Sequence, residues 1–255
     1  MLQAWLRELS GPRDFVLSSP NLHEIRAYNR LARFARGTFL LLLQGDHCLP
    51  RADSWLHTGL GFFQRFPRLG LLGGQMGFNE VPLKRIAESV SWGTEPCRPI
   101  PSRVAAGGDG GVDGLAFRFV AGVNIGPLLV RRSAFLQVGG FDEAFSCAGE
   151  PGIQLDTELS LQMWRRGHHV GVWYSGVSNG VGGRKTRSNP VQKRMRLRND
   201  NVNGRRCQRL LTKGNPAAAV AAANALLEPL GADDANARTR ELESRGMQRP
   251  RSCTV

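Results

Sequence analysis

The stretch 38-TFLLLLQGDH-47 decides the fold class, because an unbroken apolar run stops abruptly at polar residues. Such a run is typical of a strand that is buried on both faces, as in a parallel sheet covered by helices. Before it, apolar residues recur at helical spacing between residues 22 and 35, which predicts an amphipathic helix. Asp46 and His47 therefore follow the carboxyl end of a predicted buried strand.

Helical and strand patterns continue to alternate along the chain. Further strands are expected at residues 69–78, 115–120, 128–130 and 169–174. Further helices are expected after Asp53, at residues 133–138, from Leu155 to Gly167, and in the alanine-rich stretch 215–227. This order predicts an α/β fold in which helices flank a Rossmann-like, mostly parallel sheet. From Gly231 onward the composition predicts a disordered tail.

The positive charge of this chain is concentrated in one segment. Of a net charge of +13, residues 184–213 supply eleven basic groups against a single acid, Asp200. A basic run of this density suggests an anionic partner, either a phosphate, a nucleic acid or a membrane surface. The alternative is a solvated, mobile basic segment. No aromatic residue interrupts the run, so the stacking platforms of single-strand binders are missing and nucleic acid is not favoured.

Composition excludes several classes of protein. The 255 residues are 41% hydrophobic and the 31 glycines show no triplet period, so collagen-like and wholly disordered chains are excluded. The five cysteines form no CxxC pair, which argues against a zinc ribbon or a disulfide framework. No apolar run approaches the ~20 residues of a membrane helix, and no secretory signal opens the chain. We therefore expect a cytoplasmic protein with no membrane span, or a Golgi-associated one if an amino-terminal anchor is missing from this sequence.

Two acidic positions are candidates for chemistry. Asp46, with His47 beside it, follows a strand end of the kind where open α/β sheets bind ligands. A carboxylate there suits Mg²⁺ or Mn²⁺, hard cations that bridge diphosphate oxygens, although a strand-capping turn residue is the alternative. Asp156 and Glu158 lie in the first turn of a predicted helix, where the helix dipole alone favours acids. Because carboxylates two residues apart do not share a helix face, one can face a cleft as general base while the other supports it from the rim.

Three blocks of the chain form a pattern when taken together. The first is the helix 21-NLHEIRAYNR-30 with the apolar strand and 44-QGDH-47, the second is 126-GPLLVRRSAF-135 with 139-GGFDE-143, and the third is 155-LDTELSL-161. In this order they resemble the donor half, the acceptor half and the Glu-Asp-x-Glu-Leu helix of family 2 glycosyltransferases, which have the GT-A fold. The resemblance implies a glycosyltransferase-like domain over residues 1–200, with the donor half at about 15–80 and the acceptor half at about 115–180. A basic to alanine-rich extension, partly disordered, would follow over residues 201–255.

The resemblance also implies a reaction. A sugar would move with inversion from a nucleotide-diphosphate donor to a hydroxyl acceptor on a glycan, lipid or protein, with Asp156 as the general base. Asp46, assisted by His47, would hold Mn²⁺ or Mg²⁺ at the diphosphate. Arg184 and Lys185 lie where such enzymes have a mobile loop near the donor, and their cations would clamp the diphosphate.

The sequence departs from the family pattern in the metal block, in the helix block and before residue 21. A single acid, Asp46, stands where the family has two or three, and Leu155 replaces a glutamate. The strand, helix and strand that bind the nucleoside in the family are not found before residue 21, so we expect an N-terminally truncated sheet. Two other interpretations stay open: a catalytically inactive GT-A-like module that binds sugars or partners, and a basic nucleic-acid-binding protein that uses residues 184–213.

Overall fold

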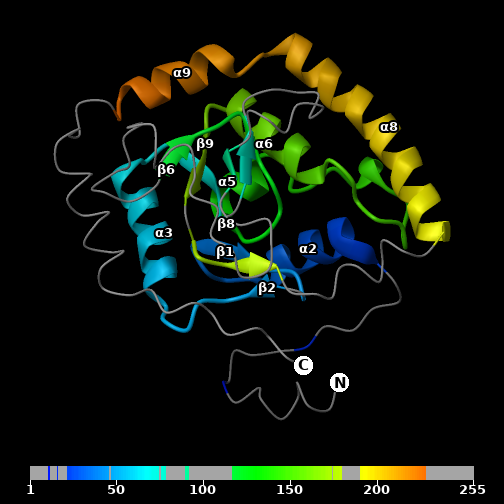
Figure 1. The fold of residues 1–255 in the computed structure, drawn as a ribbon, viewed down its shortest axis with the longest axis horizontal. Coiled ribbons are helices and arrows are strands. Elements are labelled where there is room, and N and C mark those ends of the chain that lie inside the picture. Colours follow the sequence, from blue (N-terminus) through cyan, green and yellow to red (C-terminus); the bar gives the residue numbers. More distant parts are fainter. Residues whose placement is uncertain are drawn as a thin grey trace.

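The structure is a computed structural model of the chain. It describes residues 11, 16, 22–45, 47–74, 76–78, 90–91, 117–173, 175–179 and 190–227. Within these residues a five-stranded sheet is flanked by helices, which confirms the predicted α/β class (Figure 1).

The central sheet is mixed, so the prediction of a mostly parallel sheet is wrong. In spatial order its strands are β1 (Phe39–Leu42), β8 (Leu128–Arg131), β3 (Leu69–Gly73), β9 (His169–Trp173) and β6 (Phe117–Phe119). Strands β3 and β9 run parallel, whereas β8 runs antiparallel to both of its neighbours and β6 runs antiparallel to β9. The apolar runs predicted the strands correctly because a covered central strand is apolar on both faces, but that pattern does not record the direction of the neighbouring strand.

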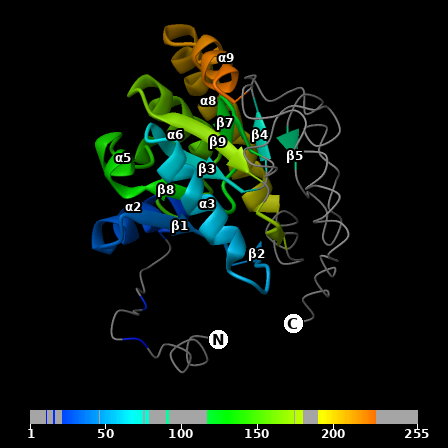
Figure 2. The same ribbon diagram turned by 90° about the vertical axis from the view of Figure 1, so that its left-hand side faces the viewer.

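Two smaller sheets lie beside the central one. β2 (His47–Cys48) pairs with β10 (Ser178–Asn179), and β4 (Met76–Phe78) pairs with β5 (Val90–Ser91) and β7 (Gly122–Val123). The stretch predicted as one strand over residues 69–78 is thus divided between β3 and β4 at Gly74. A Cβ atom at Gly74 would lie 2.5 Å from Cγ of Pro127 and 2.8 Å from Oγ of Ser175, so the absence of a side chain lets the segments approach. Figure 2 shows β4 and β5 on the opposite side of the molecule from the helices α2 and α5.

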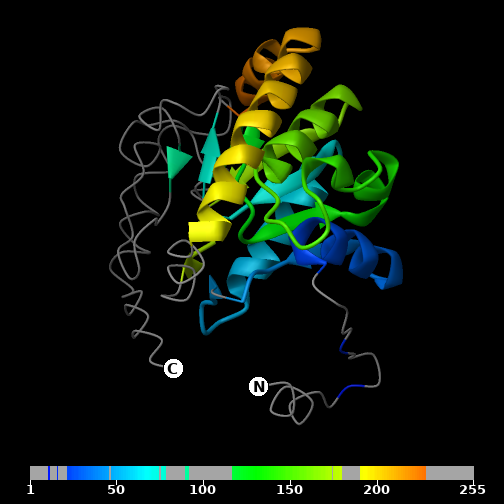
Figure 3. The same ribbon diagram turned by 90° about the vertical axis from the view of Figure 1, so that its right-hand side faces the viewer.

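The helices follow the predicted pattern, with one addition. The predicted helices correspond to α2 (His23–Phe34), α3 (Ser54–Arg65), α5 (Arg132–Gln137), α6 (Leu155–Arg165) and α9 (Ala217–Ala225). The addition is α8 (Pro190–Lys213), a 24-residue helix that contains most of the basic run. It packs against α6 and continues through residue 200, where the glycosyltransferase-like domain was expected to end (Figure 3). Among the helices of the described residues, none is both long and apolar enough to cross a membrane.

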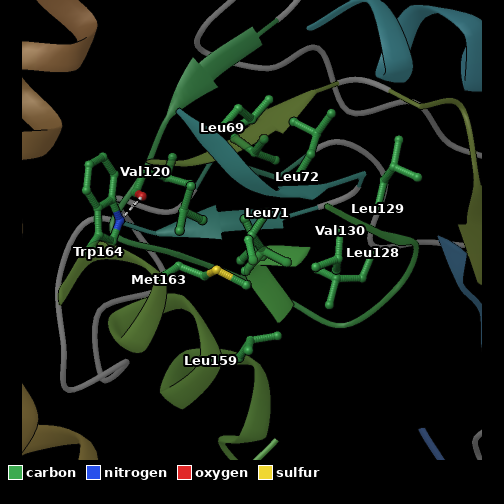
Figure 4. Close-up of a cluster of buried hydrophobic side chains, with 14 of the residues drawn as sticks. Leu69, Leu71, Leu72, Val120, Leu128, Leu129, Val130, Leu159, Met163 and Trp164 are labelled. Atoms are coloured by element: carbon green, nitrogen blue, oxygen red, sulfur yellow. Dashed lines mark hydrogen bonds between the residues drawn. The ribbon is translucent and has the colours of Figure 1, made fainter. Parts of the chain in front are cut away.

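Helices α3 and α6 cover opposite faces of the central sheet. Figure 4 shows Met163 of α6 reaching Leu71 of β3. The next residue, Leu72, points to the other face and is paired in register with Leu129 of β8. Gly59 of α3 approaches that face, since a Cβ atom there would lie 3.1 Å from Cδ2 of Leu129. The loops at the ends of these strands are therefore supported by a core that is covered on both sides.

Candidate functional site

Asp156 lies in the first turn of α6, and both of its carboxylate oxygens accept backbone hydrogen bonds. Oδ2 accepts from the N–H of Ile125 at 2.9 Å, and Oδ1 accepts from the N–H of Thr157 at 2.8 Å. These two bonds hold the carboxylate in one orientation, and the residue as a whole is half-buried. Burial raises the pKa of Asp156 above the ordinary aspartate range, and the backbone hydrogen bonds oppose part of that rise. A fixed carboxylate with a raised pKa is suited to accept a proton from a hydroxyl.

The entry into α6 is a strained turn that side-chain contacts hold in place. Gln154, which precedes the helix, has a φ of +67°, in the left-handed region that few residues other than glycine adopt. Its Nε2 donates to Oδ1 of Asp200 at 2.9 Å, and its Oε1 accepts from Oγ1 of Thr157 at 3.1 Å. These contacts fix the backbone two residues before Asp156, which sets the direction in which the carboxylate leaves the helix.

His47 lies in β2, with its ring against the backbone of Gly126. Its Nδ1 accepts from the N–H of Gln44 at 3.0 Å. A Cβ atom at Gly126 would lie 2.3 Å from Nε2 of His47, and Gly126 has a φ of +139°, so this position requires glycine. Gly126 directly follows Ile125, whose N–H holds the carboxylate of Asp156. His47 and Asp156, two predicted site residues far apart in sequence, therefore contact adjacent residues of one loop, Gly126 and Ile125.

Glu158 is buried and does not take the rim position that was expected for it. It is 3% exposed, and its Oε2 has no hydrogen-bond partner among the residues that the structure describes. Burial raises the pKa of Glu158 to about 7, with a hydrogen bond from Gln162 opposing the rise and the charge of Asp142 adding to it. Residues two apart on a helix are separated by about 200° around its axis. Asp156 therefore reaches the loop at Ile125, whereas Glu158 faces the interior.

Helix α8 holds the loop that leads into α6. Nδ2 of Asn203 donates to the carbonyl oxygens of Phe145 and Ile153, at 2.7 Å in both cases. Nδ2 of Asn199 donates to the carbonyl oxygen of Pro151 at 3.1 Å. Both asparagines are buried, so these bonds replace water at carbonyl groups that the loop cannot pair by itself.

The sequence contained a signal for this contact that apolar periodicity alone misses. Asn199, Asn203 and Cys207 recur at every fourth residue, which places them on one face of a helix. All three are buried against the rest of the protein. The inner face of α8 is therefore partly polar. Because this face lacks a repeat of apolar residues, the sequence predicted only a basic run here and not a helix.

The remaining predicted site residues, Asp46, Arg184 and Lys185, lie outside the described residues. Within the described ranges, no three histidine, cysteine, aspartate or glutamate side chains are grouped so as to hold a metal ion. His47, the described member of the predicted metal pair, uses Nδ1 to accept a backbone hydrogen bond and places Nε2 beside Gly126. The described residues do not by themselves form a cation site.

Comparison with known proteins assigns no family to this chain. No family model matches the sequence, and no curated protein matches it. The functional interpretation therefore depends on the geometry around Asp156 and on the sequence blocks that resemble a known family.

Proposed function

We propose that this protein is an inverting glycosyltransferase that moves a sugar from a nucleotide-diphosphate donor to a hydroxyl acceptor. The observation that carries the proposal is the carboxylate of Asp156, which two backbone N–H groups fix in place while part of the residue stays accessible. The finer description of the fold as GT-A-like belongs to the same proposal. It is supported by the order of the three sequence blocks, which supply β1, β8 and α6.

In the proposed reaction Asp156 acts as the general base. Each carboxylate oxygen has two acceptor positions, so a lone pair remains on each after the two backbone hydrogen bonds are made. Asp156 takes the proton of the acceptor hydroxyl as the hydroxyl oxygen bonds to the anomeric carbon. The bond from that carbon to the diphosphate oxygen breaks, and the leaving nucleoside diphosphate takes the electron pair. Burial favours the neutral, protonated form of Asp156 and so favours this transfer.

The pairing of β2 with β10 supports the proposed donor side of the site. Asn179 of β10 lies opposite His47, and Ser178 lies opposite Cys48. Arg184 follows Asn179 by only five residues in the sequence. Asn179 thus lies beside His47, the residue that follows Asp46. The sequence continues from Asn179 to Arg184 and Lys185, the proposed diphosphate clamp.

The proposal is tested by measuring nucleoside diphosphate release from a panel of nucleotide sugars, with Mn²⁺ and with a chelator. We expect Asp156→Asn to lower turnover by at least ~100-fold while donor binding, measured by calorimetry, is retained. Asp53→Asn is the matched control, because Asp53 is exposed at the start of α3, and it should leave turnover unchanged. Donor binding without turnover would favour the inactive binding module, and equal turnover of the Asp156 variant and the parent protein would refute the proposed base. Loss of turnover with the chelator would support the proposed cation at Asp46.

A further inference from the structure

Helix α8 presents most of its positive charge away from the protein. Over 24 residues it contains eight basic side chains and one acid, Asp200. Two of the eight serve the fold: Arg198 pairs with Glu150, and Arg206 donates to the carbonyl oxygen of Ala144. The other six basic side chains of α8 belong to exposed residues.

Three of these arginines form a straight row. At about 100° per residue, Arg194, Arg205 and Arg209 fall within a sector of about 60° around the helix axis. Asn203, at the centre of the buried face, lies about 150° from the middle of that sector. The row extends over about 22 Å along the helix. One face of α8 thus holds the loop before α6, and the opposite face offers a line of cations; we call this opposite face the arginine face.

Apolar side chains are exposed on the arginine face and beside it. Val191 falls within the same sector and is 49% exposed. Leu197, 56% exposed, and Val202, 38% exposed, flank the sector on its two sides. This combination of cations with exposed aliphatic side chains is the pattern of a helix that lies in the plane of a membrane interface.

We propose that the arginine face of α8 docks on an anionic membrane surface. The guanidinium groups of the row bind lipid phosphates and carboxylates, and the aliphatic side chains reach the boundary of the acyl chains. Because Asn199 and Asn203 bind the loop before α6, the helix docks as part of the folded domain and lies flat. This docking is independent of the proposed chemistry at Asp156.

The chemistry of the face favours lipid over nucleic acid. Phosphate contacts alone would explain the arginines, but exposed leucine and valine gain nothing from a sugar-phosphate backbone. Helix α8 has no aromatic residue on which a base could stack. A lipid headgroup region accommodates both kinds of side chain that this face offers.

The experiment uses the full chain and vesicles sedimented at ~150 mM salt. We expect binding to phosphatidylcholine vesicles with about 30% phosphatidylserine, and much weaker binding to phosphatidylcholine alone. The triple change Arg194→Gln, Arg205→Gln, Arg209→Gln should lower the partition coefficient about 100-fold, since each basic residue near an anionic surface contributes about fivefold. The matched control removes the same charge from exposed positions near α2, through Arg30→Gln, Arg33→Gln and Arg36→Gln, and should lower it less than tenfold.

A second variant separates membrane docking from general attraction to anions. Leu197→Gln keeps the charge and should still weaken vesicle binding by about tenfold, while binding of a duplex DNA of about 20 base pairs should not change. The proposal is overturned by either of two results: equal vesicle binding of the parent protein and the triple arginine variant, or tighter binding to the duplex than to the anionic vesicles at the same salt. Circular dichroism of each variant checks that α8 remains helical.

Discussion

The side chain of Asn224 and the backbone of Phe119 are joined by two reciprocal hydrogen bonds. Nδ2 of Asn224 donates to the carbonyl oxygen of Phe119, and the N–H of Phe119 donates to Oδ1 of Asn224, both at 2.9 Å. Phe119 belongs to β6, which is at one end of the strand order of the central sheet. Asn224, on α9, therefore occupies hydrogen-bonding groups that an edge strand would otherwise present to another chain.

Replacing Asn224 by alanine should expose this strand edge. We expect Asn224→Ala to lower the free energy of unfolding by about 1–3 kcal/mol, because two backbone groups lose their partners. Urea unfolding measures the change, and light scattering should show faster aggregation. Asn201→Ala, at an exposed position of α8, is the control and should change stability by less than about 0.5 kcal/mol. Equal effects of the two changes would contradict the protective role of Asn224.

Glu158 should make the protein less stable as the pH rises. Its pKa is raised from 4.5 to about 7 in the folded protein, so the folded state binds more protons than the unfolded state between these values. The contribution of Glu158 to the free energy of unfolding is fully present below pH 4.5 and is lost as the pH rises through 7. For a pKa raised by about 2.5, the loss is roughly 3 kcal/mol.

The variant Glu158→Gln should remove most of that pH dependence and be more stable than the parent protein at pH 8. Urea unfolding at several pH values between about 5 and 8 is the measurement. Some slope should remain, since burial also raises the pKa of Asp156 and its contribution has the same sign. An unchanged slope in the variant would show that the Glu158 carboxyl is solvated.

Gly126→Ala should disturb the contact between the two site segments. The added Cβ would lie 2.3 Å from Nε2 of His47, and the φ of +139° is unfavourable for alanine. We expect a loss of about 2 kcal/mol in the free energy of unfolding. His47→Ala should relieve the steric part but not the backbone strain, so a double-mutant cycle should give a coupling of about 1 kcal/mol. Simple additivity of the two changes would mean that the ring and the loop are not in contact.

Asn203→Ala should loosen the loop before α6. Two carbonyl oxygens, of Phe145 and Ile153, lose a buried donor, which should lower the free energy of unfolding by about 2 kcal/mol. Hydrogen exchange followed by mass spectrometry should show faster exchange over residues 146–154 than over α3. Uniformly faster exchange throughout the protein would indicate a general loss of stability instead.

The parts of the fold that depend on local pattern could be predicted from the sequence. Helices α2, α3 and α6 and strands β1 and β9 correspond to apolar periods that a short window contains. The order and direction of the strands could not be predicted, because β8 pairs with β1 and β3 through contacts between residues far apart in the chain. Helix α8 was missed for a different reason: its buried face is made of Asn199, Asn203 and Cys207, which give no apolar signal.

The site shows the same division between local and distant information. The place of Asp156 in the first helical turn follows from the sequence, and so does the separation of Asp156 from Glu158 around the helix. Their environments do not, because they depend on Ile125 from a distant loop and on the interior near Asp142. The contact of His47 with Gly126 could not be predicted either, because a glycine in the sequence does not indicate which distant side chain packs against it.

Strand β8 lies between β1 and β3, although both of those strands come from earlier in the chain. A fragment ending at Phe78 would hold β1 and β3 with the strand that separates them absent. A fragment beginning at Phe117 would hold β8 with neither of its partners. Neither fragment has a complete sheet to fold into, so each should require the other. Co-expressed as two polypeptides, they should reassemble by complementation, and that reassembly would make the protein usable as a split reporter of whatever brings its two pieces together.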